Sequence, residues 1–175
     1  DAFDRRHMGA NAEGMASRWG ISRAAQDSFS LRSQQRWAAA QERGAFVDEL
    51  APLAVLARDE HPRPDVTMEK LGLLKPAFAA DGTVTPGNSS GINDGAAMLA
   101  VCDARLAAEK GWRPLARISG SFAVGCAPAD MGTGPVIATR GLCAALGVDL
   151  ASFDAVELNE AFAAQAIVCL RELGL

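Results

Sequence analysis

The sequence predicts an α/β fold whose strands and helices pack in layers. The second half of the chain alternates short apolar runs, which suit strands, with segments of helical periodicity, and this order is typical of layered α/β domains. The first half differs, because long helical segments and a proline-bearing connection dominate it. We therefore interpret the first half as an inserted cap and the second half as part of an α/β core.

Start and stop signals bound the elements expected in the first half. Ser22 is a suitable N-cap for a helix that runs to about Arg43, with Gly44 as its terminator. Pro52 places the next apolar run at a sheet edge, because proline cannot donate a backbone hydrogen bond. The elements expected here are helices at about 11–19, 22–43 and 67–74 and an edge strand at 50–57.

Glycine and proline residues also mark the expected ends of elements in the second half. Gly111 ends one expected helix, and Pro135 and Gly147 bracket another. The alanine-rich residues 96–102 suit a strand or a helix equally well. The elements expected here are strands at 96–102, 115–124 and 153–158 and helices at 103–110, 135–146 and 160–173.

Composition narrows the class of protein. The chain has 175 residues and a formal net charge of −4, which argues against nucleic acid as the main partner. No apolar run approaches the length that spans a membrane. The four cysteines lack CxxC spacing and lie mostly in apolar sequence, which indicates reduced thiols and a cytoplasmic location. His7 and His61 lack the His-Glu-x-x-His pattern, so we expect no metal site.

Asn159 stands where a short apolar strand is expected to turn into a helix. Val156 and Leu158 belong to the strand, and the helical periodicity begins near Phe162. Ligands of α/β proteins bind at such junctions, because the first N–H groups of a helix are unpaired and positively polarised. Spacing alone favours a simpler role for Asn159, as the N-cap of that helix.

A glycine-rich loop at residues 82–97 is a second candidate binding element. Glycine lets a ligand approach the backbone closely, and the hydroxyls of Ser89 and Ser90 can donate or accept hydrogen bonds. The same composition also suits a plain turn-rich connection. The glycine spacing matches neither a Walker loop nor a dinucleotide-binding fingerprint.

An ordered series of short motifs, running nearly from end to end, resembles the thiolase family of acetyl-CoA acetyltransferases and 3-ketoacyl-CoA thiolases. The order of the motifs makes the resemblance specific, since no single tetrapeptide is. The motifs are Asp1-Ala2-Phe3, His7-Met8-Gly9, Ala12-Glu13, Ile21-Ser22-Arg23 through Gln26-Asp27, Ser33-Gln34-Gln35-Arg36, Phe46-Val47-Asp48-Glu49, Leu71 with Leu74-Lys75-Pro76-Ala77-Phe78, the loop 82–97, Met131-Gly132-Thr133-Gly134-Pro135 and Asn159-Glu160-Ala161-Phe162.

The resemblance implies a thiolase-like layered αβα fold of which this chain is an internal fragment. Residues 1–94 would be part of the loop or cap domain with its CoA-binding loop, and residues 95–175 the first half of the C-terminal thiolase domain. Thiolases carry a nucleophilic cysteine before this region, and a Gly-His-Pro histidine and a second cysteine after it. We therefore expect the parent protein to be an acyl-CoA C-acyltransferase that forms an acyl-cysteine intermediate, and this fragment alone to be inactive.

The resemblance also assigns roles to individual residues. Asn159 would anchor an ordered water that, with a histidine outside this chain, forms an oxyanion hole. Without the family, Arg63 suits a solvated loop and Phe162 suits a core. The residues that the resemblance places along the acyl group and coenzyme A are His7, Met8, Arg63, Leu74, Phe78, Pro86, Ser89, Ser90, Gly91 and Phe162.

The expected partners follow from the same resemblance. Acyl-CoA would be the substrate, with no metal or redox cofactor, and the full-length protein would be a homodimer or homotetramer in fatty acid metabolism. Acyl chain length stays open, because the opening motifs resemble acetoacetyl-CoA enzymes whereas the short connection 58–66 resembles degradative thiolases. Two alternatives remain: a noncatalytic acyl-CoA-binding protein with a degenerate thiolase fold, and an interaction fragment that completes an oligomer.

Overall fold

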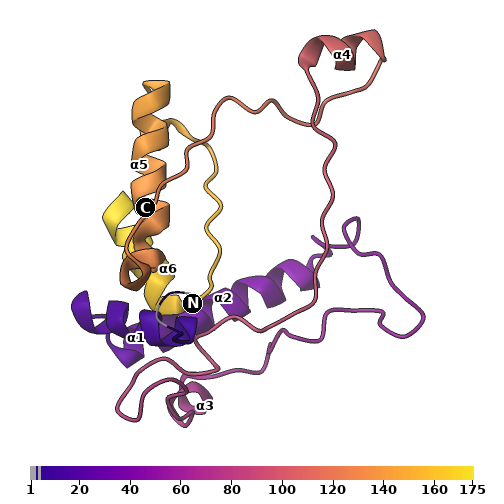
Figure 1. Ribbon diagram of the computed structural model, residues 1–175. Coiled ribbons are helices and arrows are strands. Elements are labelled where there is room, and N and C mark those ends of the chain that lie inside the picture. Colours follow the sequence, from indigo (N-terminus) through magenta and orange to yellow (C-terminus); the bar gives the residue numbers. More distant parts are fainter. Residues whose placement is uncertain (1–2, 4) are drawn as a thin grey trace.

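The computed structural model describes residue 3 and residues 5–175, so Asp1 and Ala2 of the first thiolase-like motif lie outside the described residues. Three helices, α1, α2 and α6, gather at one end, whereas α4 stands apart at the tip of two long extended segments (Figure 1). The helices are α1 (Met8–Arg18), α2 (Arg23–Glu42), α3 (Met68–Gly72), α4 (Ala104–Glu109), η1 (Pro128–Thr133), α5 (Gly134–Leu146), η2 (Leu150–Ser152) and α6 (Ala163–Leu173).

Local capping explains most helix boundaries. The Ser22 hydroxyl accepts a hydrogen bond from Ala25 N–H at 3.2 Å at the start of α2, as expected of an N-cap. Asp103 caps α4 in the same way. Gly147 and Gly174 end α5 and α6 with φ of 66° and 73°, a left-handed conformation that glycine adopts without strain. The predicted ends of these helices are confirmed to within a few residues.

The start of α6 differs from the prediction. The helix begins at Ala163, with Phe162 in the N-cap position, so the prediction of Asn159 as N-cap is wrong. The Ala163 N–H donates to the carbonyl of Asn88 at 2.9 Å. A distant loop thus satisfies the first free N–H group of the helix, and Asn159 lies in the irregular segment before it.

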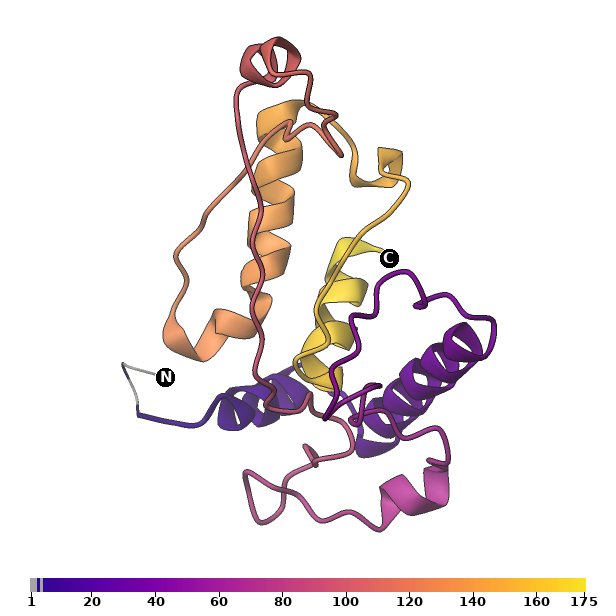
Figure 2. The same ribbon diagram turned by 90° about the vertical axis from the view of Figure 1, so that its right-hand side faces the viewer.

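The segments expected as strands run without a hydrogen-bonded ladder. Residues 50–57 instead contain a tight turn, in which Leu53 and Leu56 exchange backbone hydrogen bonds of 2.9 and 3.1 Å. Residues 96–102 are extended rather than helical, and residues 115–124 and 153–158 are extended as well (Figures 1 and 2). Strands need a neighbour for their backbone groups, and within the described residues the pairings outside helices are isolated bridges.

The core lies where α1, α2 and α6 meet. Its buried side chains come from both ends of the chain, and Trp19, Ala25 and Ile167 pack around them. Helix α5 runs beside α6, and α3 packs on α2 (Figure 2). The buried members of this core are Met15, Ala16, Ile21, Ala164 and Val168.

Candidate functional site

Two segments that are far apart in the sequence meet through their backbones. Ser89 and Phe162 form an antiparallel bridge, and Ser90 N–H donates to the carbonyl of Ala161 at 3.0 Å. The Ser89–Gly91 turn of the glycine-rich loop therefore lies directly beside the segment that contains Asn159. The two motifs that the sequence singled out are thus adjacent in the structure.

Two polar side chains, one partly buried and one buried, hold the glycine-rich loop in place. The carboxylate of Glu13, on α1, accepts hydrogen bonds from the backbone N–H groups of Thr83 and Val84, the shortest of them 2.8 Å. Asn88 accepts from Thr85 N–H at 2.8 Å through its side-chain oxygen. Hydrogen bonds to a carboxylate are stronger than those between neutral groups, so the bonds from Glu13 stabilise this conformation of the loop.

A cavity of about 320 Å³ opens next to this junction. Its volume falls in the usual range of small-ligand sites. All of its side chains are uncharged, and amides supply most of its polar groups, so it suits a neutral, partly apolar ligand. The cavity is lined by Met8, Asn11, Ala12, Met15, Met131, Gly132, Pro135, Leu158, Asn159, Ala161, Phe162 and Gln165.

Asn159, Met8 and Phe162 are the predicted site residues that line the cavity. Asn159 is exposed rather than turned into the protein interior. An exposed carboxamide in the wall of a cavity can orient a ligand or a water molecule by donating and accepting hydrogen bonds.

An aromatic row connects two further predicted residues to the cavity. The rings of His7 and Phe78 stack with centroids 4.6 Å apart, and Phe78 meets Phe162 edge to face at 6.0 Å. His7 also caps α1, because its Nδ1 accepts a hydrogen bond from Gly9 N–H at 3.0 Å. The row therefore brings together residues from the start of α1, the segment after α3 and the segment before α6.

The remaining predicted residues lie outside the cavity lining. Gly91 lies against the His61 ring, which leaves no room for a Cβ there, and Leu74 packs against Gly87 of the same loop. Pro86 is exposed. The Arg63 guanidinium donates to carbonyls of its own loop, including that of Glu60 at 2.6 Å, so in this structure its hydrogen bonds serve the loop.

Several lining residues had no role in the sequence-based site. Met131 belongs to a motif that resembles thiolases, and this was the signal available for it. Met15 and Gln165 could not be found in this way, because their periodicity is that of ordinary core residues. Gln165 donates through Nε2 to the Cys169 sulfur at 3.3 Å, and the Cys169 thiol donates to the carbonyl of Gly132, also at 3.3 Å. These contacts hold η1 against α6, and burial raises the pKa of the Cys169 thiol.

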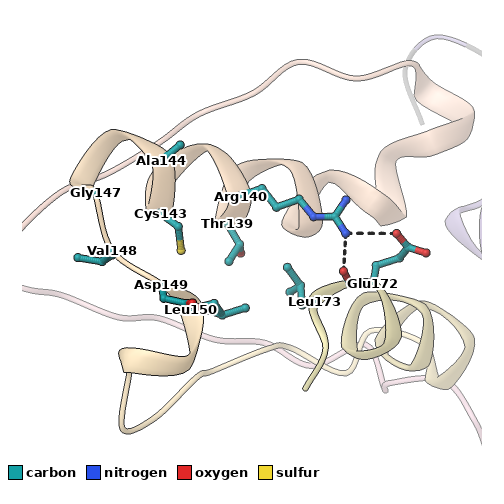
Figure 3. Close-up of a pocket in the computed structure, with 10 residues that line it drawn as sticks. All are labelled: Thr139, Arg140, Cys143, Ala144, Gly147, Val148, Asp149, Leu150, Glu172 and Leu173. Carbon is teal, nitrogen blue, oxygen red and sulfur yellow. Dashed lines mark hydrogen bonds and ion pairs between the residues drawn. The ribbon is translucent and has the colours of Figure 1, made fainter.

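A second hollow, of about 490 Å³, lies between α5, η2 and the end of α6 (Figure 3). Arg140 projects towards α6 and donates to the backbone carbonyl of Glu172. The Arg140 guanidinium is thus hydrogen-bonded within the protein. None of the predicted site residues line this hollow. Among residues 3 and 5–175, no cluster of three or more His, Cys, Asp or Glu side chains is placed to bind a metal ion, and no described helix is long and apolar enough to cross a membrane.

Comparisons with protein-family models match nearly the whole chain. The model "Thiolase, N-terminal domain" matches residues 1–105, and "Thiolase, C-terminal domain" matches residues 112–175. Among curated proteins, the chain is 47% identical to a β-ketoadipyl-CoA thiolase of Pseudomonas aeruginosa, with 96% of this chain and 44% of that protein aligned. It is 48% identical to an acetyl-CoA acetyltransferase of Chromobacterium violaceum, with 99% and 47% aligned. The chain thus spans just under half the length of these relatives.

Solved structures show the same relationship in three dimensions. The acetyl-CoA acetyltransferase of Bacillus anthracis superposes with a TM-score of 0.93 at 42% identity, over 100% of this chain and 46% of that one. Human mitochondrial 3-ketoacyl-CoA thiolase in complex with CoA superposes with a TM-score of 0.88 at 41% identity, over 100% and 45%. The predicted thiolase-like αβα fold class is confirmed. The ordered motifs, the junction of the two segments and these matches lead to one conclusion: the chain belongs to the thiolase family.

Proposed function

We propose that the protein carrying this chain is an acyl-CoA C-acyltransferase of the thiolase type. Such an enzyme cleaves a 3-ketoacyl-CoA with CoA, or condenses two acyl-CoA molecules in the reverse direction, through an acyl-cysteine intermediate. The observation that supports this function most directly is the backbone junction between the Ser89–Gly91 turn and the Asn159 segment, beside an uncharged cavity. Named relatives include acetyl-CoA acetyltransferases and a thiolase bound to CoA.

In this mechanism a cysteine thiolate attacks the thioester or keto carbonyl, and the electron pair of that carbonyl moves to its oxygen. When the tetrahedral intermediate collapses, its C–C or C–S bond breaks, and the leaving enolate or CoA thiolate takes the proton that the cysteine had given up. The acyl group stays on the cysteine until a CoA thiolate, or the enolate of a second acyl-CoA in the reverse direction, attacks it and frees the cysteine thiolate. Thiolases supply the nucleophilic cysteine from outside the region that this chain matches. The chain would contribute Asn159, whose amide holds a water against the thioester oxygen without adding a charge.

The pantetheine arm of the substrate would run along the Ser89–Gly91 turn towards the cavity. Ser90 and Pro86 are exposed beside this path, whereas His7, Phe78 and Phe162 form an aromatic wall next to it. Met8 at the cavity wall would contact the acyl group. Arg63 and Leu74 would extend the binding surface towards the nucleotide and the loop. Coenzyme A is therefore substrate, and the proposed reaction needs no metal or redox cofactor.

We further propose that the full-length protein is a homodimer or homotetramer of the cytoplasm. All four cysteines are free, which suits a reducing compartment. The oligomeric state is open to measurement by light scattering. A protein that binds CoA but does not turn over 3-ketoacyl-CoA would favour the alternative of a noncatalytic acyl-CoA-binding protein.

Replacement of Asn159 by alanine tests the proposed function. In the full-length protein, N159A should lower kcat for acetoacetyl-CoA thiolysis by about a hundredfold to a thousandfold, because one oxyanion-hole donor is lost. The Kd for CoA, measured by calorimetry, should change little. The matched control is Gln35→Ala, which removes an exposed amide from α2 and should leave both values unchanged. An N159A enzyme as active as the wild type would refute the role of Asn159.

A further inference from the structure

A buried hydrogen-bond path links α2 to the glycine-rich loop. Asp27, of which the side chain is only 3% exposed, accepts from Arg23 Nε at 2.7 Å through one carboxylate oxygen. Its other oxygen accepts from the side-chain amide of Asn88 at 3.0 Å. The Nη2 group of Arg23 donates to the carbonyls of Leu71 and Leu74, at 2.6 and 2.9 Å. The carboxylate therefore sits between a fixed guanidinium and a loop amide.

Asn88 is the residue at which this path divides. Its side chain donates to Asp27 and to the carbonyl of Thr83, and it accepts from Thr85 N–H. Its backbone carbonyl accepts from the N–H of Ala163, the first residue of α6. The next residue, Ser89, begins the turn that pairs with Phe162. A single buried asparagine thus connects α2, the Ser89–Gly91 turn and the start of α6.

We propose that Asp27 and Asn88 are a positioning pair that fixes the Ser89–Gly91 turn for the pantetheine arm of CoA. This inference rests on the proposed function, because it specifies which residues set the geometry of that same site. Neither side chain lines the cavity, so the pair would act only through the turn. Helix α6 has support of its own from Ala164 and Val168 in the core, so the helix should keep its place when the pair is broken, and we expect the segment before it to move less than the turn.

The physical reason lies in the burial of both partners. Asn88 is 2% exposed, and asparagine at position 27 offers one acceptor oxygen where aspartate offers two, so the side chain of either Arg23 or Asn88 loses its acceptor there. A buried donor without an acceptor must find another or shift. An uncharged group at position 27 also leaves the Arg23 guanidinium without its carboxylate. The loop can relieve both losses by moving, and the turn would move with it. A displaced turn weakens CoA binding, while the chemistry at Asn159 continues.

The test replaces Asp27 by asparagine in the full-length protein. D27N should raise the KM for acetoacetyl-CoA and the calorimetric Kd for CoA by about tenfold, while kcat changes by no more than about threefold. The matched control is Glu109→Gln, which removes the carboxylate of another i,i+4 arginine pair, Arg105–Glu109, whose side chains are 79% and 53% exposed.

A merely structural role predicts a different result. If D27N lowers Tm but leaves KM and Kd unchanged at a temperature where the protein is folded, the proposal is wrong. If D27N does not fold, Asn88→Ser replaces it, because that variant keeps the Arg23–Asp27 ion pair, and the same rise in Kd for CoA is expected. A wild-type protein that binds CoA without turnover would refute the proposed reaction, yet the Kd values would still decide the role of the pair.

Discussion

At the scale of single residues, the site depends on polar atoms whose partners come from distant parts of the chain. The carboxylate of Glu13 on α1 accepts hydrogen bonds from the backbone N–H groups of Thr83 and Val84. The backbone carbonyl of Asn88 accepts a hydrogen bond from the N–H of Ala163. Cys169 belongs to the same class, because its thiol donates to the carbonyl of Gly132 in the cavity wall. Each of these contacts is buried or partly buried, where an unpaired polar group is costly.

Cys169 should resist alkylation in the native protein. Burial raises the pKa of its thiol, and the thiolate is the reactive form. We expect peptide-resolved mass spectrometry to find Cys169 unlabelled by iodoacetamide at neutral pH and labelled after unfolding in urea. Rapid native labelling of Cys169 would contradict its burial.

The raised pKa of Cys169 also makes the free energy of unfolding depend on pH, and the sign of this dependence follows from the direction of the shift. Above the ordinary thiol pKa of about 8.5 the unfolded chain loses this proton while the folded chain keeps it. The contribution of Cys169 to the free energy of unfolding is therefore complete below that pH and is lost as the pH rises through the higher, folded-state pKa. Urea midpoints of the wild type and of Cys169→Ala, compared on both sides of that pH, should converge as the pH rises.

At the scale of elements, helix α1 shows how packing overrides helix propensity. It contains two glycines, Gly9 and Gly14, in one continuous helix. A Cβ added at Gly9 would collide with the ring of Phe78, whereas one added at Gly14 meets nothing within 4 Å. Phe78 is the middle member of the aromatic row beside the cavity. The glycine at position 9 is thus required by the site, and the one at position 14 is not.

These two glycines form a matched pair for mutagenesis. Gly14→Ala should stabilise the protein by about 0.5–1 kcal/mol, since alanine loses less backbone entropy in a helix. Gly9→Ala should destabilise it by about 1–3 kcal/mol, because the methyl group displaces Phe78. Denaturant unfolding of the two variants measures the difference directly. Equal stability of the two variants would show that the Phe78 ring does not fix the position of α1.

At the scale of the whole molecule, the extended segments present an unusual amount of apolar surface. Leu115, Ile92 and Met98 are 100%, 98% and 96% exposed. They belong to the segments that lead to and from α4, the helix that stands apart from α1, α2 and α6 (Figure 1). Such surfaces and unpaired strand edges promote association with other chains.

The 175-residue chain, when expressed by itself, should therefore associate. Size-exclusion chromatography with light scattering should find it as oligomers or aggregates, and it should enhance the fluorescence of an apolar dye. Charged substitutions at Ile92, Met98 and Leu115 should reduce both effects, whereas a charge added at the exposed Gln35 on α2 should not. A monodisperse monomer that does not bind the dye would contradict this prediction.

The sequence by itself determined what depends on neighbours along the chain. Ser22 and Asp103 mark helix starts, and Gly147 and Gly174 mark helix ends, because capping bonds and left-handed turns are local. The ordered motifs identified the family, and they predicted Asn159 and the glycine-rich loop as site elements.

Only the tertiary structure decided how these parts fit together. Helix α6 begins at Ala163, where the carbonyl of Asn88, from a distant loop, accepts its first free N–H group. Met15 and Gln165 join the cavity because α1 and α6 pack against each other. The Asp27–Asn88 hydrogen bond likewise exists only after α2 and the loop meet. Periodicity and capping report local energies, whereas the partner of a buried polar group is set by contacts between segments that the sequence order does not encode.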